Sequence, residues 1–192
     1  MQLKTLSLGL AITLASSVTL AAPVDYKIDP THTATVFSWN HFGFSTPSAN
    51  FTNIQGVIKV DNEKPANSSV EVTIPLSSVN TNVAALDKEF QEEAWFNAAK
   101  YPNITFKSTK VETKDKKHFK ITGDLTVKGV TKPVVLDAVL NKQGEHPMLK
   151  VPAIGFNATT SFNRSDFGIG SYVPMVGDKI TVNITTEAAA AK

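Results

Sequence analysis

Strict alternation of apolar and polar residues is the feature of this sequence that most restricts its fold. From Phe119 to Lys128, apolar residues and glycine occupy the odd positions, while lysine, threonine and aspartate occupy the even ones. The same period of two recurs at 70–74, 134–140, 154–158 and 180–187. A strand turns successive side chains to opposite faces, and one apolar face with one polar face is typical of antiparallel sheet. We therefore predict an all-β protein.

Turn-forming stretches separate the alternating segments, at 61–65, 114–117, 128–133 and 141–144. We predict strands near 24–28, 33–42, 51–60, 69–75, 103–111, 118–127, 131–141, 151–162 and 179–187. Sequential hairpins of this kind favour an up-and-down barrel, because closure leaves no unpaired edge. A two-sheet sandwich is the alternative fold. A barrel of about eight strands is just wide enough to be filled by its own side chains or to hold one slender ligand.

One segment departs from the period of two. Its apolar residues recur at helical spacing, namely Val83, Leu86, Phe90 and Ala94. We predict one short helix near 82–94, with Asn82 as its N-cap. We expect Trp95 and Phe96 to pack against the barrel, over one of its mouths. A second turn is predicted at 163–168.

The first residues have the composition of a secretory signal peptide. Lys4 precedes an apolar segment, 6–15, and small residues follow up to Ala22. The apolar segment is short for a membrane span, and no later stretch approaches the roughly 18 apolar residues that a spanning helix needs. We predict a signal peptide over 1–21 and a single mature domain over 22–192, located outside the cytoplasm. An uncleaved N-terminal anchor is the alternative.

Composition and charge exclude several classes of function. The chain has 19 Lys plus Arg, 17 Asp plus Glu and no Cys. Without cysteine there are no disulfides, thiolate metal ligands or cysteine nucleophiles. A net charge of +2 is too balanced for a nucleic-acid-binding protein. The basic run Lys114, Lys116 and Lys117 is interpreted as a solvated hairpin tip that discourages edge pairing.

No motif in the chain indicates a metal site or a catalytic site. His32 and His41 are an odd number of positions apart, so they would face opposite sides of one strand. His118 and His146 fall in a hairpin and a loop. The sequence has neither a nucleophile elbow nor an evident inward pair of carboxylates. We predict no bound metal, no catalytic residues and no enzymatic activity.

Arg164 is the only arginine of the chain, and it stands beside Asp166 in a predicted turn at one end of the barrel. Its simplest role is an Arg–Asp clamp that holds the turn. The alternative role is a guanidinium near the barrel mouth, available to an anionic headgroup. Phenylalanines on most strands allow an apolar tube, although the sequence leaves open whether that tube is filled or hollow.

Four long motifs follow one another along the chain: IDPTHTATVFSWNH at 28–41, WFNAAKYPNITFKSTKV at 95–111, LTVKGVTKPV at 125–134, and FNRSDFG at 162–168 with VGD at 176–178. Together they resemble the YceI-like family of bacterial periplasmic proteins. The chain departs from the usual family pattern at Lys128, where many relatives have histidine, and at Ala49, where glycine is more usual. Both departures fall in hairpins that could shape a mouth.

The resemblance implies a periplasmic protein with an extended, eight-stranded, lipocalin-like barrel that holds a long amphiphile. Polyisoprenoids, such as the tails of isoprenoid quinones or prenyl phosphates, are the expected ligands, with fatty-acid derivatives as variants. We predict no cofactor apart from a bound polyisoprenoid or fatty-acid-like lipid, and relatives suggest a homodimer. On this basis the main hypothesis is a secreted, non-enzymatic protein that sequesters or carries a polyisoprenoid-like lipid, without a membrane span once the signal peptide is removed.

The residues predicted to line the tunnel are Phe37, Trp39, Phe106, Phe119, Leu125 and Phe156, and those predicted to make polar contacts near its ends are His32, His41 and Arg164. Which face of the strand carrying Phe37 and Trp39 points inward stays open at this stage. Two other functions are kept as alternatives. One is a structural or stress-response barrel with a solid core and no ligand, and the other is a periplasmic hydrolase of lipids or esters.

Overall fold

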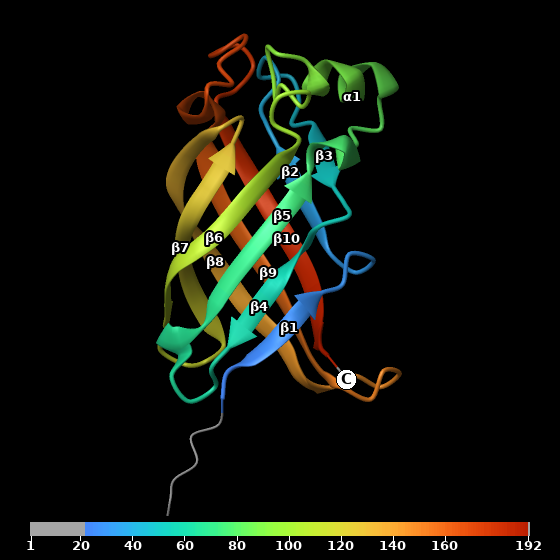
Figure 1. The fold of residues 1–192 in the computed structure, drawn as a ribbon. Helices are drawn as coiled ribbons and strands as arrows, with labels where there is room; N and C mark the ends of the chain where they lie inside the picture. The colour runs from blue at the N-terminus through green and yellow to red at the C-terminus, as the bar shows by residue number, and fades with distance from the viewer. Residues whose placement is uncertain (1–21, 192) are drawn as a thin grey trace, which may run out of the picture.

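The computed structural model describes residues 22–191 as one antiparallel sheet of ten strands that closes on itself (Figure 1). The strands are β1 Val24–Ile28, β2 Ala34–Ser38, β3 Ser48–Phe51, β4 Gln55–Val60, β5 Ser69–Pro75, β6 Asn103–Thr113, β7 His118–Val127, β8 Val130–Glu145, β9 Pro152–Asn163 and β10 Lys179–Ala190. Neighbours in the sheet follow the order β1-β4-β5-β6-β7-β8-β9-β10-β2-β3, and β1 also pairs with β10. That last pairing closes the barrel.

The ten strands form an eight-stranded barrel, because two of the barrel strands are each interrupted. β1 and β2 together make one of these barrel strands, and β3 and β4 together make the other. β1 and β2 lie one after the other along β10, where Ile28 pairs with Ala188 and Ala34 pairs with Thr185. In the same way β1 pairs with β4 and β2 pairs with β3. The predicted all-β barrel is therefore confirmed, and the two-sheet sandwich is wrong.

The interruptions are the main difference from the predicted strands. The strand predicted over 33–42 ends at Ser38, and His41 beyond it forms isolated bridges with Ser45 and Val176. The strand predicted over 51–60 is split between β3 and β4. Asn53 in the gap has a left-handed backbone with φ of 54°, a conformation that asparagine tolerates and that breaks a strand.

The α-helix of the described residues, α1, spans Ala84–Gln91 and lies at the upper end of the barrel (Figure 1). Trp95 and Phe96, which follow it, pack against the core of the barrel. The helix is shorter than the predicted 82–94, and Asn82 is not its N-cap. Asn82 has φ of 62°, and the helix begins after Val83 without a side-chain cap. Within the described residues there are also three 3₁₀ helices, η1 Pro65–Asn67, η2 Leu76–Ser78 and η3 Arg164–Phe167, the last confirming the turn predicted at 163–168.

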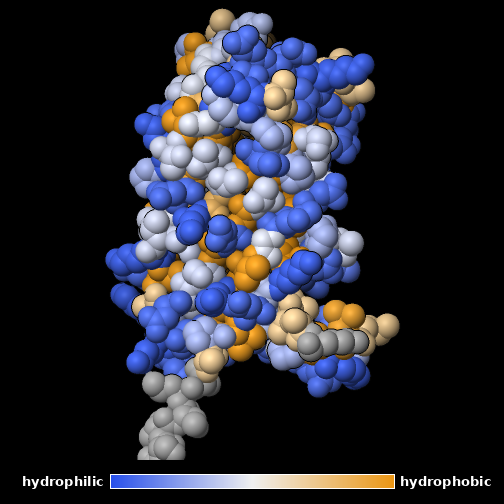
Figure 2. Space-filling view, in the orientation of Figure 1, coloured by the Kyte–Doolittle hydropathy of each residue, from blue (hydrophilic) through white to orange (hydrophobic). Residues whose placement is uncertain are grey.

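The alternation in the sequence separates the inside of the barrel from its outside. On β7 the residues Ile121, Leu125 and Val127 are buried, while Lys120 and Asp124 are exposed. On the side of the barrel seen in Figure 2, polar side chains cover most of the outer surface, with apolar atoms in small patches between them. Within residues 22–191, no helix is both long and apolar enough to cross a bilayer. The predicted signal peptide lies outside the described residues.

Candidate functional site

The barrel encloses an apolar cavity of about 420 Å³ to which all ten strands contribute. Aliphatic and aromatic side chains make up most of its wall. Several of them point inward yet remain only partly buried, namely Val70, Val72, Phe119, Leu136, Phe156, Phe162 and Ile184. In a filled barrel these side chains would pack against one another across the centre. Their incomplete burial shows that the barrel is hollow, a point that the sequence left open.

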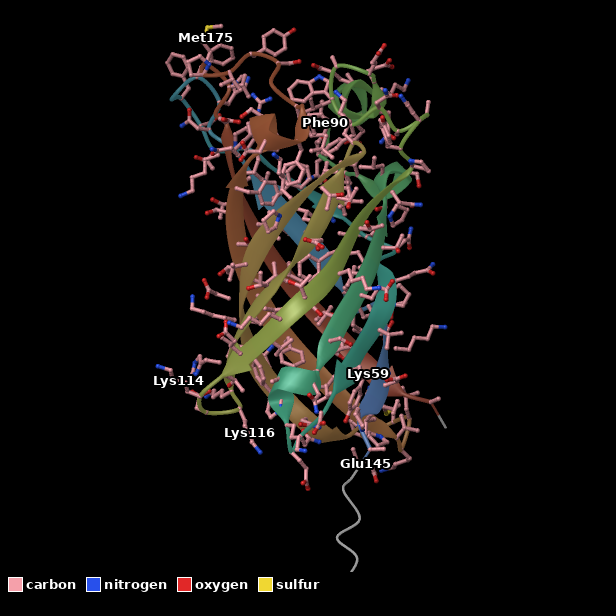
Figure 3. The ribbon with its side chains drawn as sticks, turned by 60° about the vertical axis from the view of Figure 1, so that its left-hand side comes forward. Lys59, Phe90, Lys114, Lys116, Glu145 and Met175 are labelled. Carbon is pink, nitrogen blue, oxygen red and sulfur yellow. The ribbon has the colours of Figure 1, made fainter. Side chains whose placement is uncertain are left out.

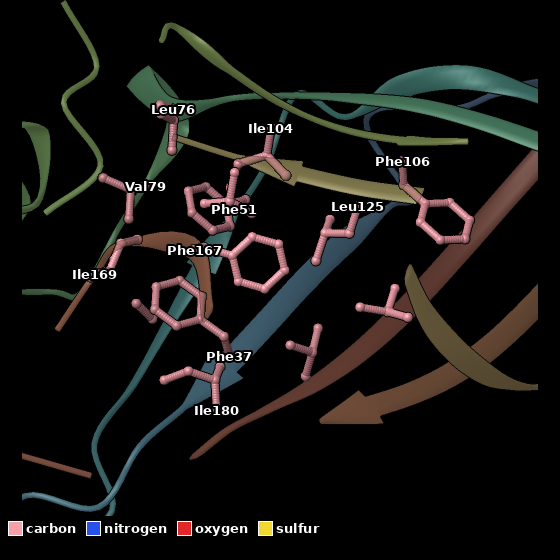
Figure 4. Packing of buried hydrophobic residues seen from close by; sticks show 14 of the residues in the cluster. Phe37, Phe51, Leu76, Val79, Ile104, Phe106, Leu125, Phe167, Ile169 and Ile180 are labelled. Atoms are coloured by element: carbon pink, nitrogen blue, oxygen red, sulfur yellow. The ribbon is translucent and has the colours of Figure 1, made fainter. Parts of the chain in front are cut away.

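Aromatic rings close the upper end of the cavity. Phe37 stacks on Phe51 with ring centroids 5.1 Å apart and on Trp39 at 5.7 Å. Phe90 of α1 completes the cluster, 5.7 Å from Trp39 and 5.9 Å from Phe96. Phe167 and Ile169 from the loop after β9 converge on the same region, as Figure 4 shows, and both are buried. This end of the cavity is therefore blind.

Polar, exposed residues surround the opposite end. The residues that line the cavity there include Lys59, Asn62, Ser69, Lys116 and Gln143, all of which are exposed. In Figure 3, Lys59 and Lys116 lie at the end of the barrel away from Phe90. Lys116 Nζ donates a hydrogen bond of 2.7 Å to the backbone oxygen of Asn62, which links the β6–β7 hairpin to the β4–β5 loop. The cavity thus has a mouth between these two loops.

Small residues keep the middle of the cavity open. Ala138 on β8 pairs directly with Ala158 on β9, and both line the cavity. Directly paired residues on one face of a sheet lie about 5 Å apart, so large side chains at these two positions would project together into the cavity. The two alanines place only methyl groups there. The cavity therefore remains wide enough beside these alanines to admit the hydrocarbon chain of a ligand.

The six residues predicted to line the tunnel all line the cavity: Phe37, Trp39, Phe106, Phe119, Leu125 and Phe156. Phe37 and Trp39 are each 8% exposed and point inward, so the orientation of their strand is established. Contact between these side chains and a ligand stays a prediction.

Arg164 lines the cavity at its blind end and is only 5% exposed. It donates four hydrogen bonds to backbone oxygens: Nε to Gly177 (3.0 Å), Nη1 to Ile169 (2.8 Å), and Nη2 to Ser171 and Val176 (2.8 Å each). Its guanidinium carbon also lies 5.5 Å from the centre of the Trp95 ring. Burial lowers the pKa of Arg164, and nearby Asp178 opposes that shift. Arg164 therefore clamps the loop, as expected, but onto carbonyls rather than onto Asp166.

The two predicted histidines do not line the cavity. His32 is exposed in the turn between β1 and β2, where its Nδ1 lies 2.8 Å from Asp29 Oδ2. This hydrogen bond raises the pKa of His32, whereas hydrogen bonds from Thr31 and His32 lower the pKa of Asp29 to about 2. His41 lies in an exposed loop with its ring against Phe42. The geometry gives neither histidine a route to a ligand in the cavity.

Sequence reasoning missed the polar residues at the mouth. The sequence pattern around Lys116 indicates a solvated hairpin tip, and nothing in the sequence marks Asn62 or Gln143 as site residues. Gln143 lines the cavity because the strand pairing shifts between Leu140 and Lys142, which turns an odd-numbered residue inward after a run of even-numbered ones. No group of three or more metal-ligating side chains occurs in the part of the chain that the structure describes.

Comparison with known proteins agrees with this architecture. The YceI-like domain matches residues 26–188. Protein YceI of Escherichia coli O157:H7 is 38% identical over 188 residues, covering 95% of this chain and 97% of the relative. The crystal structure of the Campylobacter jejuni YCEI protein is 32% identical with a TM-score of 0.71, covering 80% of this chain and 90% of that one.

A more distant likeness extends to the fold alone. A polyisoprenoid binding domain from Saccharophagus degradans, implicated in plant cell wall breakdown, has a TM-score of 0.68 at 13% identity, covering 88% of this chain and 99% of that one. The matched domain and the identity to the E. coli protein both span nearly the whole barrel. This chain therefore belongs to the YceI-like family.

Proposed function

We propose that this protein is a periplasmic, non-enzymatic binding protein that holds the chain of one long amphiphile, of the polyisoprenoid or fatty-acid class, inside the barrel. The observation that carries the proposal is a hollow, apolar cavity that is blind at one end and has a polar mouth at the other. A ligand that fits this shape has a long apolar tail and a polar head. The family and the secretory pattern of residues 1–21 support the location.

The length of the cavity suits such a chain. Phe119 and Val127, at the two ends of β7, both line it. Their separation along the strand is about 26 Å at about 3.3 Å per residue, or about 20 Å along the axis of a barrel whose strands tilt by about 40°. Burial of each CH₂ contributes about 0.8 kcal/mol, so a five-carbon isoprene unit contributes on the order of 3–4 kcal/mol. The tail alone can therefore supply the affinity.

Specificity for the tail is weak in such a cavity. An apolar wall distinguishes chains that differ by one methylene by only about 1–3 kcal/mol, because it offers no directional contact. Chains of similar girth should therefore compete for the barrel, and any sharper selection has to come from the polar head.

The cavity offers no arrangement for the hydrolase alternative. Among the described residues that line it there is no histidine, and both oxygens of the carboxylate present, that of Asp61, accept hydrogen bonds. Asp61 accepts hydrogen bonds from the backbone nitrogens of Glu63 and Lys64 and from Asn67 Nδ2. A general base and a nucleophile within reach of one another are therefore missing from this part of the wall.

The test is native mass spectrometry of the protein purified from the periplasm, followed by extraction and identification of any bound molecule. We expect a stoichiometric long-chain amphiphile. Ala158→Phe, which places a ring in the middle of the cavity, should lose it, whereas Thr159→Phe, the adjacent outward position on β9, should retain it. A wild-type protein that stays free of ligand, even after incubation with isoprenoid quinones, prenyl phosphates and fatty acids, would contradict the proposal.

A further inference from the structure

We propose that Lys116 at the mouth receives an anionic headgroup, carboxylate or phosphate, so that the barrel selects acidic amphiphiles over neutral ones with the same tail. This inference rests on the proposed function and goes further, because it assigns the class of headgroup and the direction in which the ligand lies. It starts from the position of Lys116, which is at once a residue of the cavity wall and an exposed cation.

The head of the ligand has to remain at the mouth. Away from the mouth the wall is mostly aliphatic and aromatic, and an unpaired charge among those side chains would be costly. The cation at the blind end, Arg164, already uses four of its five N–H groups on backbone oxygens. Arg164 therefore serves mainly to hold the loop, and the cation with more free donors is at the other end.

Lys116 has donors to spare. An ammonium group has three N–H donors, and the structure engages one of them, in the bond to the Asn62 oxygen. No carboxylate of residues 22–191 lies within salt-bridge distance of Lys116 Nζ. Lys59, the other lysine at the mouth, is paired with Asp25 at 3.4 Å. Lys116 is thus the lysine of the cavity wall with an uncompensated charge.

The hairpin holds Lys116 in place before any ligand arrives. Its backbone has φ of 58°, and its backbone nitrogen donates to Thr113 Oγ1 at 3.0 Å. Asp115 Oδ1 accepts hydrogen bonds from the backbone nitrogens of Lys117 and His118 at 2.9 and 2.8 Å. Together with the bond to Asn62, these contacts fix the ammonium beside the opening, which reduces the ordering cost of binding an anion.

The first test compares two pairs of probes with matched tails: palmitate with hexadecanol, and geranylgeranyl monophosphate with geranylgeraniol. The mature protein, stripped of lipid, should bind each anion about tenfold more tightly than its alcohol, since a charge-assisted hydrogen bond forms only with the anion. The preference should decrease as salt is raised. The carboxylate and phosphate pairs show which of the two anions is favoured.

In Lys116→Met, the Kd of each anion should come within about twofold of the Kd of its alcohol, while the Kd of the alcohol stays unchanged. Lys116→Arg should retain the preference, and so should Lys114→Met, which removes a charge from the same hairpin outside the cavity wall. Equal binding of anion and alcohol by the wild type would overturn the inference. A preference that survives Lys116→Met, or an equal loss of both probes in that variant, would also overturn it. Failure of all four probes to bind would instead contradict the proposed function itself.

The second test reads the direction of the ligand. Trp39 and Trp95, the two tryptophans of the chain, both line the blind end of the cavity. With the carboxylate at Lys116, bromine on the last carbon of palmitate should quench their fluorescence strongly, and bromine on carbon 2 should quench it little. Stronger quenching by the 2-bromo acid would place the head beside the tryptophans and overturn the assignment.

Discussion

The ring of Phe106 on β6 occupies the space into which a side chain at Gly123 on β7 would project. A Cβ at position 123 would lie 2.4 Å from Phe106 Cζ and 2.7 Å from the backbone oxygen of Lys107. Because position 123 is a glycine, the Phe106 ring can lie against the wall of the barrel rather than across the cavity. The open cross-section of the cavity beside Phe106 therefore depends on the absence of a side chain at position 123.

Gly123→Ala should therefore disturb both the fold and the cavity. The Lys107 oxygen belongs to the backbone and cannot move freely, so we expect a loss of about 1–3 kcal/mol in the free energy of unfolding. Any accommodation by the Phe106 ring moves it into the cavity and weakens lipid binding. Urea denaturation and lipid titration measure the two effects. Gly155→Ala is the control, because its new Cβ would be 3.7 Å from its nearest neighbour. Equal stability of the two variants would contradict this account.

Arg164→Met should destabilise the protein by about 3 kcal/mol or more. The substitution leaves the buried carbonyls of Ile169 and Val176 without their donor, and each unpaired group costs about 1–3 kcal/mol. Chemical denaturation of the variant measures the loss. Lys128→Met provides a comparison, since Lys128 Nζ bonds the Gly168 oxygen at 3.2 Å on the surface and its removal should cost less than about 1 kcal/mol. Similar losses in both variants would show that Arg164 is not the clamp.

The Phe90→Ala variant should loosen the blind end. Phe90 is the buried residue of α1, and it contacts Trp39 and Phe96. Removing a buried phenylalanine costs about 3–5 kcal/mol, and the resulting gap under α1 gives a bound lipid a second route out. We expect faster lipid release in stopped-flow experiments. Val83→Ala, at an exposed position just before the helix, should release lipid at the wild-type rate. An unchanged release rate in Phe90→Ala would mean that α1 does not close the cavity.

The contact between His32 and Asp29 should produce a measurable pH dependence. Hydrogen bonding to Asp29 raises the pKa of His32 above 6.5, so the contact stabilises the fold below that pH and is lost as pH rises through the shifted pKa. The pKa of Asp29 is lowered from 3.8 to about 2, so its contribution is present above about pH 4 and is lost as pH falls toward 2. NMR titration of the His32 ring should give a midpoint above 6.5 that Asp29→Asn shifts downward. Asp25→Asn, on β1, removes a carboxylate that pairs with Lys59 rather than with His32 and should leave the midpoint in place.

Much of the fold could be predicted from the sequence, because strand alternation is a local property. The inward faces of β5, β7 and β9 follow directly from the period of two, and so does the antiparallel barrel. The interruptions between β1 and β2 and between β3 and β4 could not be predicted in this way. These breaks depend on single backbone conformations, such as that of Asn53, and on bridges between distant loops, such as His41 with Val176.

The site was harder to predict at its ends than along its wall. Phe106 and Val111 are an odd number of residues apart, yet both line the cavity, because the pairing of β6 with β7 shifts between Ser108 and Lys110. A bulge of this kind reverses the alternation and leaves no clear trace in composition. Arg164 stands out in the sequence as its only arginine, but its hydrogen-bond acceptors come from a loop whose path only the folded chain reveals.

A barrel with one opening fills and empties along the same path. An incoming lipid cannot displace the bound lipid through the blind end, because Phe90 and Phe167 close it. The bound lipid therefore has to leave before the next one can bind. Exchange should then proceed at a rate independent of the concentration of competing lipid. Any membrane or protein that donates a lipid to this barrel, and any that takes it away, would have to meet the same loops, around Asn62 and Lys116.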